Sequence, residues 1–350
     1  MVPSITPAPP VSHFATTVLA EFREPWAFAW LGDSNRALIT EKRGALKLWQ
    51  QGQPQQSIQG IPAVDYGGDG GLGDVVTSPD FGTTGLIYLS WVEAGNADIR
   101  GAVVGRGRLV LDAVPRIEGL EVIWRQTPKV GGHGHYSHRL AFAPDGRSLY
   151  ISSGDRRLMT PAQDPRSDLG KIIRVPLGPT PTNAVGLPQQ VSLGHRNVLG
   201  LKFDSQGWLW GLEHGPAGGD ELNLVKPGNN YGWPKVSEGD HYDGSKIPRH
   251  RTRPKFSAPA ISWNPVIAPG DFLFYSGAMF PEWRGQAIIA GLRTQALIRV
   301  AIKGETAQEL ARHPMQNRVR SVAEDRDGAL LILEDGPHGR LLRLARPERK

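Results

Sequence analysis

The sequence predicts an all-β fold, a six-bladed β-propeller with long loops on the face that carries the active site. A loose repeat of apolar strand, polar or glycine-containing turn and second apolar strand occurs six times along the chain. Within each copy, apolar and polar residues alternate over short stretches, which is the period of a β-strand. The 350 residues include 43 glycines and 29 prolines, a composition that disfavours long helices because proline breaks them and glycine weakens them.

The six copies follow one another in order. Turns such as the Pro-Asp-Gly of residues 144–146 and the Arg-Asp-Gly of residues 326–328 have hairpin chemistry, because glycine accepts a positive φ. Six copies leave more chain per copy than a compact blade needs, and we assign the excess to loops at residues 156–169, 176–190 and 227–259. A pair of β-sandwiches or a different blade count is the alternative. The copies span residues 26–49, 72–92, 138–155 with 170–175, 200–215 with 220–225, 279–302 and 320–345.

The domain organisation follows from the same pattern. We expect residues 21–350 to form a single propeller domain and residues 1–20 to form an extended, proline-rich lead-in. The first residues show neither a charged n-region nor an apolar h-region, so no signal peptide is predicted. No apolar run reaches 18 residues, so no membrane span is predicted.

Composition excludes several classes of function. The chain has no cysteine, which excludes disulfides, a thiol nucleophile and cysteine-ligated metals. Its net charge of +6 is spread along the chain rather than gathered in runs, so we expect no nucleic-acid partner. A small anionic ligand held by a few converging arginines fits this charge equally well.

The densest polar cluster is GGHGHYSHRL at residues 131–140, which contains His133, His135 and His138. Histidine exchanges protons near neutral pH, and the His-x-His spacing also suits a metal ion. His133 and His138 are equally compatible with purely structural hydrogen bonds. His135 is the stronger functional candidate, because the surrounding glycines let the backbone approach a ligand closely.

Two further clusters carry arginines. The LGHRN segment at residues 193–197 places Arg196, a planar donor suited to an anionic or carbonyl oxygen, next to Asn197. In RVR, Arg318 and Arg320 lie two residues apart in an extended segment and therefore share a face, which suggests an anionic partner. A solvated loop or an exposed strand face is the plain alternative for each.

A fourth cluster, EHGPAGGDELNL, begins at residue 213 and is followed by NNYGWP. It combines backbone carbonyls near Gly215 and Pro216 with the carboxylates of Asp220 and Glu221. Oxygen donors of mixed type held on loops suit Ca²⁺. A tight turn capped by acidic residues is the structural alternative.

Taken in this order, the four motifs resemble the soluble aldose sugar dehydrogenases of the quinoprotein glucose/sorbosone dehydrogenase family. The resemblance runs from about residue 25 to the end of the chain. It implies an enzyme with a six-bladed propeller that binds pyrroloquinoline quinone (PQQ) and Ca²⁺. It also implies oxidation of an aldose at its anomeric carbon to the lactone, with hydride passing to PQQ and an unknown external electron acceptor. We expect a periplasmic or secreted enzyme that is a monomer or a weak dimer.

The resemblance also implies a role for each matching residue. His135 matches the general base, and Asp155 matches the acid that orients it. Arg196 and Asn197 match residues that face the quinone carbonyls, Arg196 with a catalytic role as well. The remaining matches are cofactor contacts at Tyr242, Arg318 and Arg320, carbonyl ligands of the PQQ-bound Ca²⁺ at Gly215 and Pro216, and a further Ca²⁺ site at Glu221 and Tyr231.

Three positions depart from the family pattern. Asp69 stands where a glutamine is usual, and its carboxylate would repel a tricarboxylate cofactor unless it is protonated or turned toward Ca²⁺. Arg293 replaces a lysine, which keeps the charge but changes its geometry. The cofactor glutamine of the family has no clear counterpart after Asp155, and Gln163 is the candidate.

Two other classes of function stay open at this point. A calcium-dependent propeller lactonase or esterase would use His135 as a base without any quinone. It would have no need of the arginine set Arg196, Arg293, Arg318 and Arg320. A non-enzymatic propeller that binds partners through its loops would not need His135, Arg196 and the Ca²⁺-type loop together.

Overall fold

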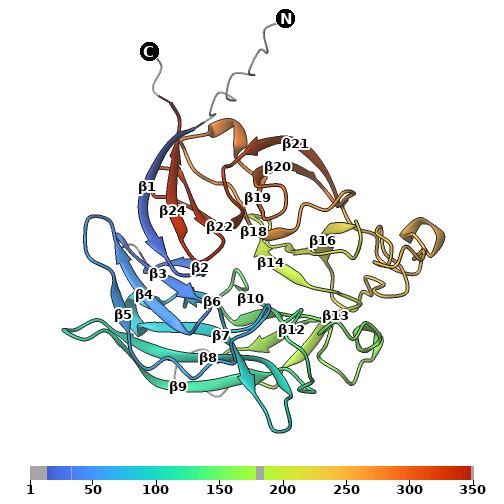
Figure 1. Cartoon of the computed structure of the whole chain (residues 1–350), viewed down its shortest axis with the longest axis horizontal. Helices are drawn as coiled ribbons and strands as arrows, with labels where there is room; N and C mark the ends of the chain where they lie inside the picture. The colour runs from blue at the N-terminus through green and yellow to red at the C-terminus, as the bar shows by residue number, and fades with distance from the viewer. Residues whose placement is uncertain (1–13, 33, 179–184, 348–350) are drawn as a thin grey trace, which may run out of the picture.

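The computed structural model describes residues 14–32, 34–178 and 185–347, and it contains six four-stranded antiparallel sheets. The sheets stand around a common axis as the blades of a propeller, so the predicted fold is confirmed (Figure 1). In each of the first five blades the strands follow the chain order from the axis outward, because each blade is a meander of neighbouring hairpins. Among the described residues, no helix is long and apolar enough to cross a membrane.

The strand bounds show how closely the predicted repeat matches the blades. The blades are, in order, β2(Pro25–Trp30), β3(Arg36–Glu41), β4(Ala45–Gln50) and β5(Gln56–Ile58); β6(Leu72–Thr77), β7(Leu86–Ala94), β8(Arg100–Val110) and β9(Arg116–Arg125); β10(Ser137–Phe142), β11(Ser148–Ser153), β12(Lys171–Pro176) and β13(Gln189–Leu193); β14(Val198–Phe203), β15(Leu209–Glu213), β16(Asp220–Val225) and β17(Ile261–Trp263); β18(Pro269–Phe274), β19(Ala287–Gly291), β20(Ala296–Lys303) and β21(Thr306–Pro314); and β22(Val319–Glu324), β23(Leu330–Glu334) and β24(Gly339–Ala345) with β1(Ala15–Phe22). Short helical turns lie at α1(Phe81–Thr84), η1(Thr160–Gln163), η2(His250–Thr252) and η3(Pro281–Trp283).

The sixth blade is closed by the start of the chain. Strand β1 pairs antiparallel with β24, from Ala15 opposite Ala345 to Phe22 opposite Gly339 (Figure 1). The predicted lead-in of residues 1–20 is therefore too long, because residues 15–20 already belong to this strand; residues 1–13 lie outside the described part. Leu19 and Ala20 pack against a buried cluster of the first and sixth blades, so β1 is held by apolar contacts as well as by its ladder.

The predicted fifth copy, residues 279–302, begins after the inner strand of its blade. Its inner strand is β18, which precedes the predicted start at residue 279, and residues 281–283 form the turn η3 instead. The inner strands are buried on both faces because each blade packs against two neighbours, so they read as short apolar runs without a strict alternation. The segment containing β18 follows a proline-rich stretch and lacked the turn that marks the other copies.

The middle of the ring is filled by a buried arginine. The guanidinium of Arg139 donates to the carbonyl of Leu199 (2.8 Å) and to the carbonyl of Gly270 (2.7 Å). It also bonds the carboxylate of Asp74 (3.4 Å) and lies 3.8 Å from the centre of the Trp26 ring. These partners come from four further inner strands, β14, β18, β6 and β2. Arg139 therefore ties the blades together and closes the channel beneath the site.

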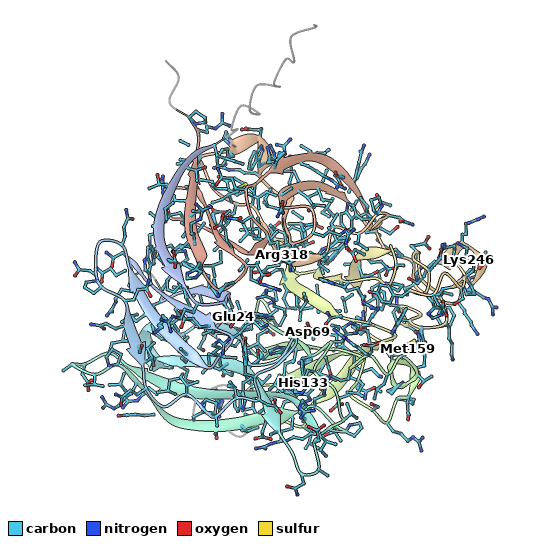
Figure 2. All side chains as sticks on the ribbon, in the orientation of Figure 1. Glu24, Asp69, His133, Met159, Lys246 and Arg318 are labelled. Carbon is cyan, nitrogen blue, oxygen red and sulfur yellow. The ribbon has the colours of Figure 1, made fainter. Side chains whose placement is uncertain are left out.

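Loops at one end of the ring carry the candidate residues. The inner strands β10 and β14 begin at this end, directly after His135 and Arg196, and the loop of residues 156–169 lies beside them. Part of the loop of residues 227–259 lies at the same end, where Trp233, His241 and Tyr242 line a cavity. The outer part of this loop, which carries Lys246, projects from the ring (Figure 2). Strand β12 ends at the opposite end, where the Leu177 N–H donates to the carbonyl of Arg147 in a hairpin turn, so the predicted loop of residues 176–190 begins away from the site; residues 179–184 lie outside the described part.

Candidate active site

Two adjoining cavities open at this end of the ring. The inner cavity, of about 250 Å³, lies on the propeller axis and is lined by residues of five blades and of the connections beside them, with Asp69 contributed by the connection that leads into the second blade. The outer cavity, of about 430 Å³, lies over the third and fourth blades. In Figure 2, Asp69 and Arg318 stand near the middle of the ring, whereas Met159 lies farther out over the outer cavity. The two cavities share His135, Arg157, Arg196 and Tyr242.

His135 is held by Asp155 at the junction of the two cavities. The Nδ1–H of His135 donates to Oδ1 of Asp155 at 2.7 Å, which leaves Nε2 as the acceptor. Trp233 donates its indole N–H to Oδ2 (2.7 Å), and the Arg157 backbone N–H donates to Oδ1 (2.9 Å). Burial would raise the pKa of Asp155, but the bond from His135 and the other donors outweigh it, so this pKa lies below its usual value. The carboxylate is therefore ionised and fixes the His135 tautomer.

Glycine at position 154 is required for this contact. A Cβ built there would lie 1.9 Å from the carbonyl oxygen of His135, a distance that no side chain tolerates. His135 itself has φ +50, in the left-handed region that non-glycine residues seldom adopt. The tight passage between residues 135 and 154 brings base and acid together, and strain of this kind often collects at functional sites.

The other two histidines have different surroundings. His138 is buried, bonds Ser90 Oγ through Nδ1 (2.9 Å) and stacks on Trp26 at 5.1 Å. Burial, and then the charge of Arg139, lower the pKa of His138 to about 3, so it stays neutral in the physiological range. His133 is partly exposed, with Nδ1 3.9 Å from Asp65. These contacts support His135 as the base among the three.

Arg196 enters the site as part of a well-anchored loop. Its backbone N–H donates to Oε2 of Glu213 (2.7 Å), and its guanidinium donates to the carbonyl of His214 (3.2 Å) and the hydroxyl of Tyr242 (3.3 Å). The Nε–H of Arg196 is buried and has no hydrogen-bond partner among the described residues. The neighbouring Asn197 also lines the inner cavity and accepts a bond from Ser137 (3.1 Å). An unsatisfied guanidinium N–H at this position indicates a site for a polar ligand.

The first and sixth blades contribute three basic side chains to the inner cavity. Arg318 and Arg320 both bond Asp335, at 2.9 Å and 2.8 Å, which holds their guanidinium groups side by side. Lys42, which the sequence analysis missed, also lines this cavity and donates to the carbonyl of Gly68 (2.9 Å). Burial, and then the charge of Arg320, lower the pKa of Lys42. Mutually repelling cations of this kind are typical of an anion site.

A positional signal could have found Lys42. The residue just after the second strand of a blade lies at the mouth of the channel, and this position holds His214, Leu292 and Asp335 in the fourth, fifth and sixth blades. Lys42 occupies it in the first blade. Arg293, which the sequence predicts as a cofactor contact, is exposed and is not among the described residues that line the inner cavity, where its neighbour Leu292 lies; its contact with a cofactor stays a prediction.

Asp69 lines the inner cavity without being protonated. Burial would raise the pKa of Asp69. The backbone N–H of His135, which donates to Oδ2 of Asp69 at 3.0 Å, and nearby positive charges lower this pKa overall. Protonation, one of the two ways in which the sequence analysis avoids repulsion of an anionic cofactor, is therefore not the one that Asp69 takes. Arg157 lies 3.4 Å from the same oxygen and offsets its charge.

Gln163 does not reach either cavity. Its amide donates to Oδ1 of Asn230 (2.9 Å) and to the carbonyl of Trp233 (2.7 Å). It therefore anchors the loop that carries Trp233 rather than a ligand. Tyr242 lies where the sequence placed it, on the loop of residues 227–259, and faces both cavities with a largely exposed ring.

The predicted metal residues gather beside the cavities. Gly215, Pro216, Glu221 and Tyr231 line one narrow space together. Glu221 is buried, and burial and then the neighbouring Glu213 raise its pKa well above the usual value. The Asn223 amide donates to both carboxylates, at 3.0 Å to Glu213 and 3.2 Å to Glu221, while its own Oδ1 is buried without a partner in the described residues.

These donors fit a hard cation of the Ca²⁺ type. Glu213 pairs with the ring of His195 at 3.0 Å, but the buried Glu221 beside it has no basic partner among the described residues, and a divalent ion would supply one. Asp220 is not available as a ligand, because it accepts the N–H groups of Gly215, Ile267 and Ala268. In the described part, no three His, Cys, Asp or Glu side chains converge on one point. Backbone carbonyls such as those of Gly215 and Pro216 would have to complete the shell.

Comparison with known proteins gives a consistent result. The sequence profile of the Glucose / Sorbosone dehydrogenase family matches residues 22–343. Aldose sugar dehydrogenase YliI of Escherichia coli (strain K12) is 34% identical over 337 residues, which cover 92% of this chain and 90% of that protein. A crystal structure of a glucose dehydrogenase has a TM-score of 0.87 and 36% identity, covering 95% of this chain and 100% of its own. The PQQ-bound aldose sugar dehydrogenase from Streptomyces coelicolor has a TM-score of 0.76 and 26% identity, covering 97% and 99%.

Proposed function

Because this chain belongs to the Glucose / Sorbosone dehydrogenase family, we propose that it is a PQQ-dependent quinoprotein that oxidises an aldose at the anomeric carbon to the lactone. The observation that carries the proposal is the junction of the two cavities. An oriented base, His135, stands there between a cationic inner cavity and an outer cavity open to solvent. The inner cavity suits the cofactor and the outer cavity suits the sugar.

The residues of the inner cavity fit a planar, carboxylated cofactor. Lys42, Arg318 and Arg320 would hold its carboxylates, and Arg196 with Asn197 would face its polar edge. The unpartnered Nε–H of Arg196 is the feature of this chain that calls for such a ligand. PQQ, when bound, supplies the acceptor for the two electrons that leave the sugar.

His135 is proposed to take the proton of the anomeric hydroxyl. Asp155 accepts the Nδ1–H of His135, so Nε2 is the ring nitrogen that would receive the proton of the substrate. After the proton arrives, the ionised Asp155 stabilises the imidazolium, and its other oxygen stays fixed by Trp233. Arg196 is buried and contributes a fixed positive charge beside the reacting groups, where exclusion of water strengthens its effect.

The metal assignment is a separate part of the proposal. We expect Ca²⁺ to bind through the carbonyls of Gly215 and Pro216 next to the cavities, and a further Ca²⁺ to use Glu221 and the Tyr231 carbonyl. The buried carboxylates and the orphaned Asn223 oxygen support a cation in this region. The Tyr231 carbonyl already accepts a bond from His250 (3.0 Å), which leaves its second lone pair for a metal.

A lactonase or esterase is the weaker candidate. Such an enzyme could use His135 and Ca²⁺, but it has no use for Lys42, Arg318 and Arg320 in the inner cavity. A periplasmic or secreted location, an external electron acceptor and a monomeric or weakly dimeric state stay predictions.

The test is reconstitution. Purified protein is mixed with PQQ and Ca²⁺, the absorption spectrum of the bound cofactor is followed, and oxidation of several aldoses is measured with an electron-accepting dye. We expect dye reduction that depends on both PQQ and sugar, with the lactone as the product. Release of acid from lactones or esters without PQQ, and no sugar oxidation with it, would favour the hydrolase instead.

A further inference from the structure

The outer cavity is short of free carboxylates. Neutral sugars are commonly held by carboxylate acceptors, but Asp155 is the one acidic side chain among the described residues that line this cavity. Both of its oxygens are taken, by His135 and Arg157 on one side and Trp233 on the other. Two guanidinium groups, those of Arg157 and Arg196, line the same space. Its charge is therefore suited to an anionic group.

Arg157 is presented to the cavity by a strained segment. Arg156, Arg157 and Met159 have φ values of +56, +61 and +60, which non-glycine residues rarely adopt. The two arginines then point in different directions. Arg156 is buried and donates to the carbonyls of Gly134 (2.9 Å) and Arg100 (2.7 Å), so it anchors the segment. Arg157 keeps 64% of its side chain exposed.

The packing around Arg157 fixes where its guanidinium lies. A Cβ at Gly134 would fall 2.1 Å from Nε and 2.6 Å from Cζ of Arg157, so the absence of a side chain there makes room for it. Its Nη2 approaches Oδ2 of Asp69 at 3.4 Å, and the same oxygen accepts the His135 N–H at 3.0 Å. Asp69 thus ties Arg157 to the backbone of the proposed base. The described residues offer no other bond to the guanidinium.

We propose that Arg157 is a specificity-determining residue, and that the outer cavity selects aldoses that carry an anionic group, a carboxylate or a phosphate. The inference rests on the proposed function and names its substrate class. A guanidinium with free N–H groups binds either anion through a planar pair of hydrogen bonds, which a sugar hydroxyl cannot match. The position beside His135 leaves the anomeric hydroxyl at the base while the anionic group meets Arg157.

The experiment compares three sugars on the reconstituted holoenzyme: glucose, glucuronic acid and glucose 6-phosphate. We expect a higher kcat/KM for at least one anionic sugar than for glucose, and the preferred one identifies the anion. In R157Q this preference, the ratio of kcat/KM for the anionic sugar to kcat/KM for glucose, should fall by about ten- to a hundredfold, which is the effect of losing a hydrogen bond to a charged group. The matched control is R166Q, on the same loop, whose side chain is 89% exposed and paired with Asp164.

Two binding measurements separate this inference from its alternatives. Calorimetry of glucuronic acid and glucose 6-phosphate with the protein should show tighter binding to the native chain and to R166Q than to R157Q, whether or not turnover is observed. Because Arg157 offsets the charge of Asp69 beside the cofactor, absorption titration should show a PQQ affinity in R157Q that is lower than in the native chain by less than about tenfold. A larger loss of PQQ affinity in R157Q would assign Arg157 to the cofactor and overturn the inference. Equal loss for all three sugars, or no anionic preference, would overturn it too. Failure to oxidise any sugar with normal calorimetry would defeat the proposed function alone.

Discussion

The cavities and the plug beneath them, which consists of Arg139 and the groups that it contacts, are built from the same kinds of residue. They differ in how much of the hydrogen-bonding capacity of these residues is used within the protein. In the plug, all three guanidinium nitrogens of Arg139 bond protein oxygens. In the cavity, Arg196 keeps a buried Nε–H without a partner in the described residues. His138 stacks on Trp26 and bonds Ser90, whereas His135 has Nε2 free above Asp155. Residue type therefore says little about role here, and unused polar capacity says more.

The strongest test of this comparison replaces each of the two histidines, His135 and His138, in a separate variant. His135→Gln should lower kcat by about 10²- to 10⁴-fold, because the general base is lost, while PQQ affinity changes little. His138→Gln should lower kcat far less, since the His138 ring, although it borders the inner cavity, is buried against Trp26 and bonds Ser90. Turnover and PQQ titration of both variants, side by side, check the expectation. Near-normal turnover in His135→Gln, or a larger loss in His138→Gln, would show that the base has been misassigned.

The plug should respond in stability rather than in catalysis. Arg139→Met leaves the buried carboxylate of Asp74 without its cation, which should lower the free energy of unfolding by about 3–5 kcal/mol. Arg196→Met should instead weaken PQQ binding and leave the unfolding free energy nearly unchanged. Urea denaturation of the apo proteins measures the first quantity, and absorption titration the second. Similar unfolding curves for the two variants would erase the distinction between plug and cavity.

Metal removal tests the edge of the cavity region. If Ca²⁺ binds near Gly215, Pro216 and Glu221, chelation should lower the melting temperature and release PQQ more readily. A ligand at one hundred times its Kd stabilises the native state by about 2.7 kcal/mol, which sets the scale of the effect. Calorimetric melting of metal-loaded protein before and after exhaustive EDTA treatment provides the measurement. An unchanged melting temperature would remove the cation from this site.

The smallest effect is expected at Asp69. Removing its charge by Asp69→Gln should tighten PQQ binding, but by less than about tenfold, because Arg157 already offsets the carboxylate. Absorption titration of PQQ in the variant and in the native chain gives the ratio. Looser binding in Asp69→Gln would identify the carboxylate as a partner of the cofactor rather than as a source of repulsion.

The sequence predicted the blades better than it predicted their closure. Five inner strands could be read because each blade is a local meander whose turns contain Asp-Gly or related pairs. Strand β1 was not predicted because its partner, β24, lies more than three hundred residues away in the sequence. A local sequence pattern does not indicate so distant a pairing. The apolar and polar residues of Ala15–Phe22 do not alternate cleanly, and prolines precede this segment, so no local signal marks it as a strand.

The site was predictable where motifs precede inner strands and unpredictable where short basic pairs lie in turns. His135 and Arg196 belong to dense motifs that lead into β10 and β14. Lys42 and Arg157 belong to the pairs of residues 42–43 and 156–157, and their importance comes from what the fold places opposite them. Arg293 shows the sensitivity of this reasoning, since a shift of one residue gives the cavity position to Leu292.

The pairing of Ala15–Phe22 with Gly339–Ala345 also dictates an order of events in the life of the protein. The first strand must wait for the last one, so the ring cannot close until synthesis has delivered residue 345. Trp26 from the first blade and Arg320 from the last both line the inner cavity, so this cavity is not complete until that moment. A cofactor can therefore enter the complete cavity only after these two strands have paired.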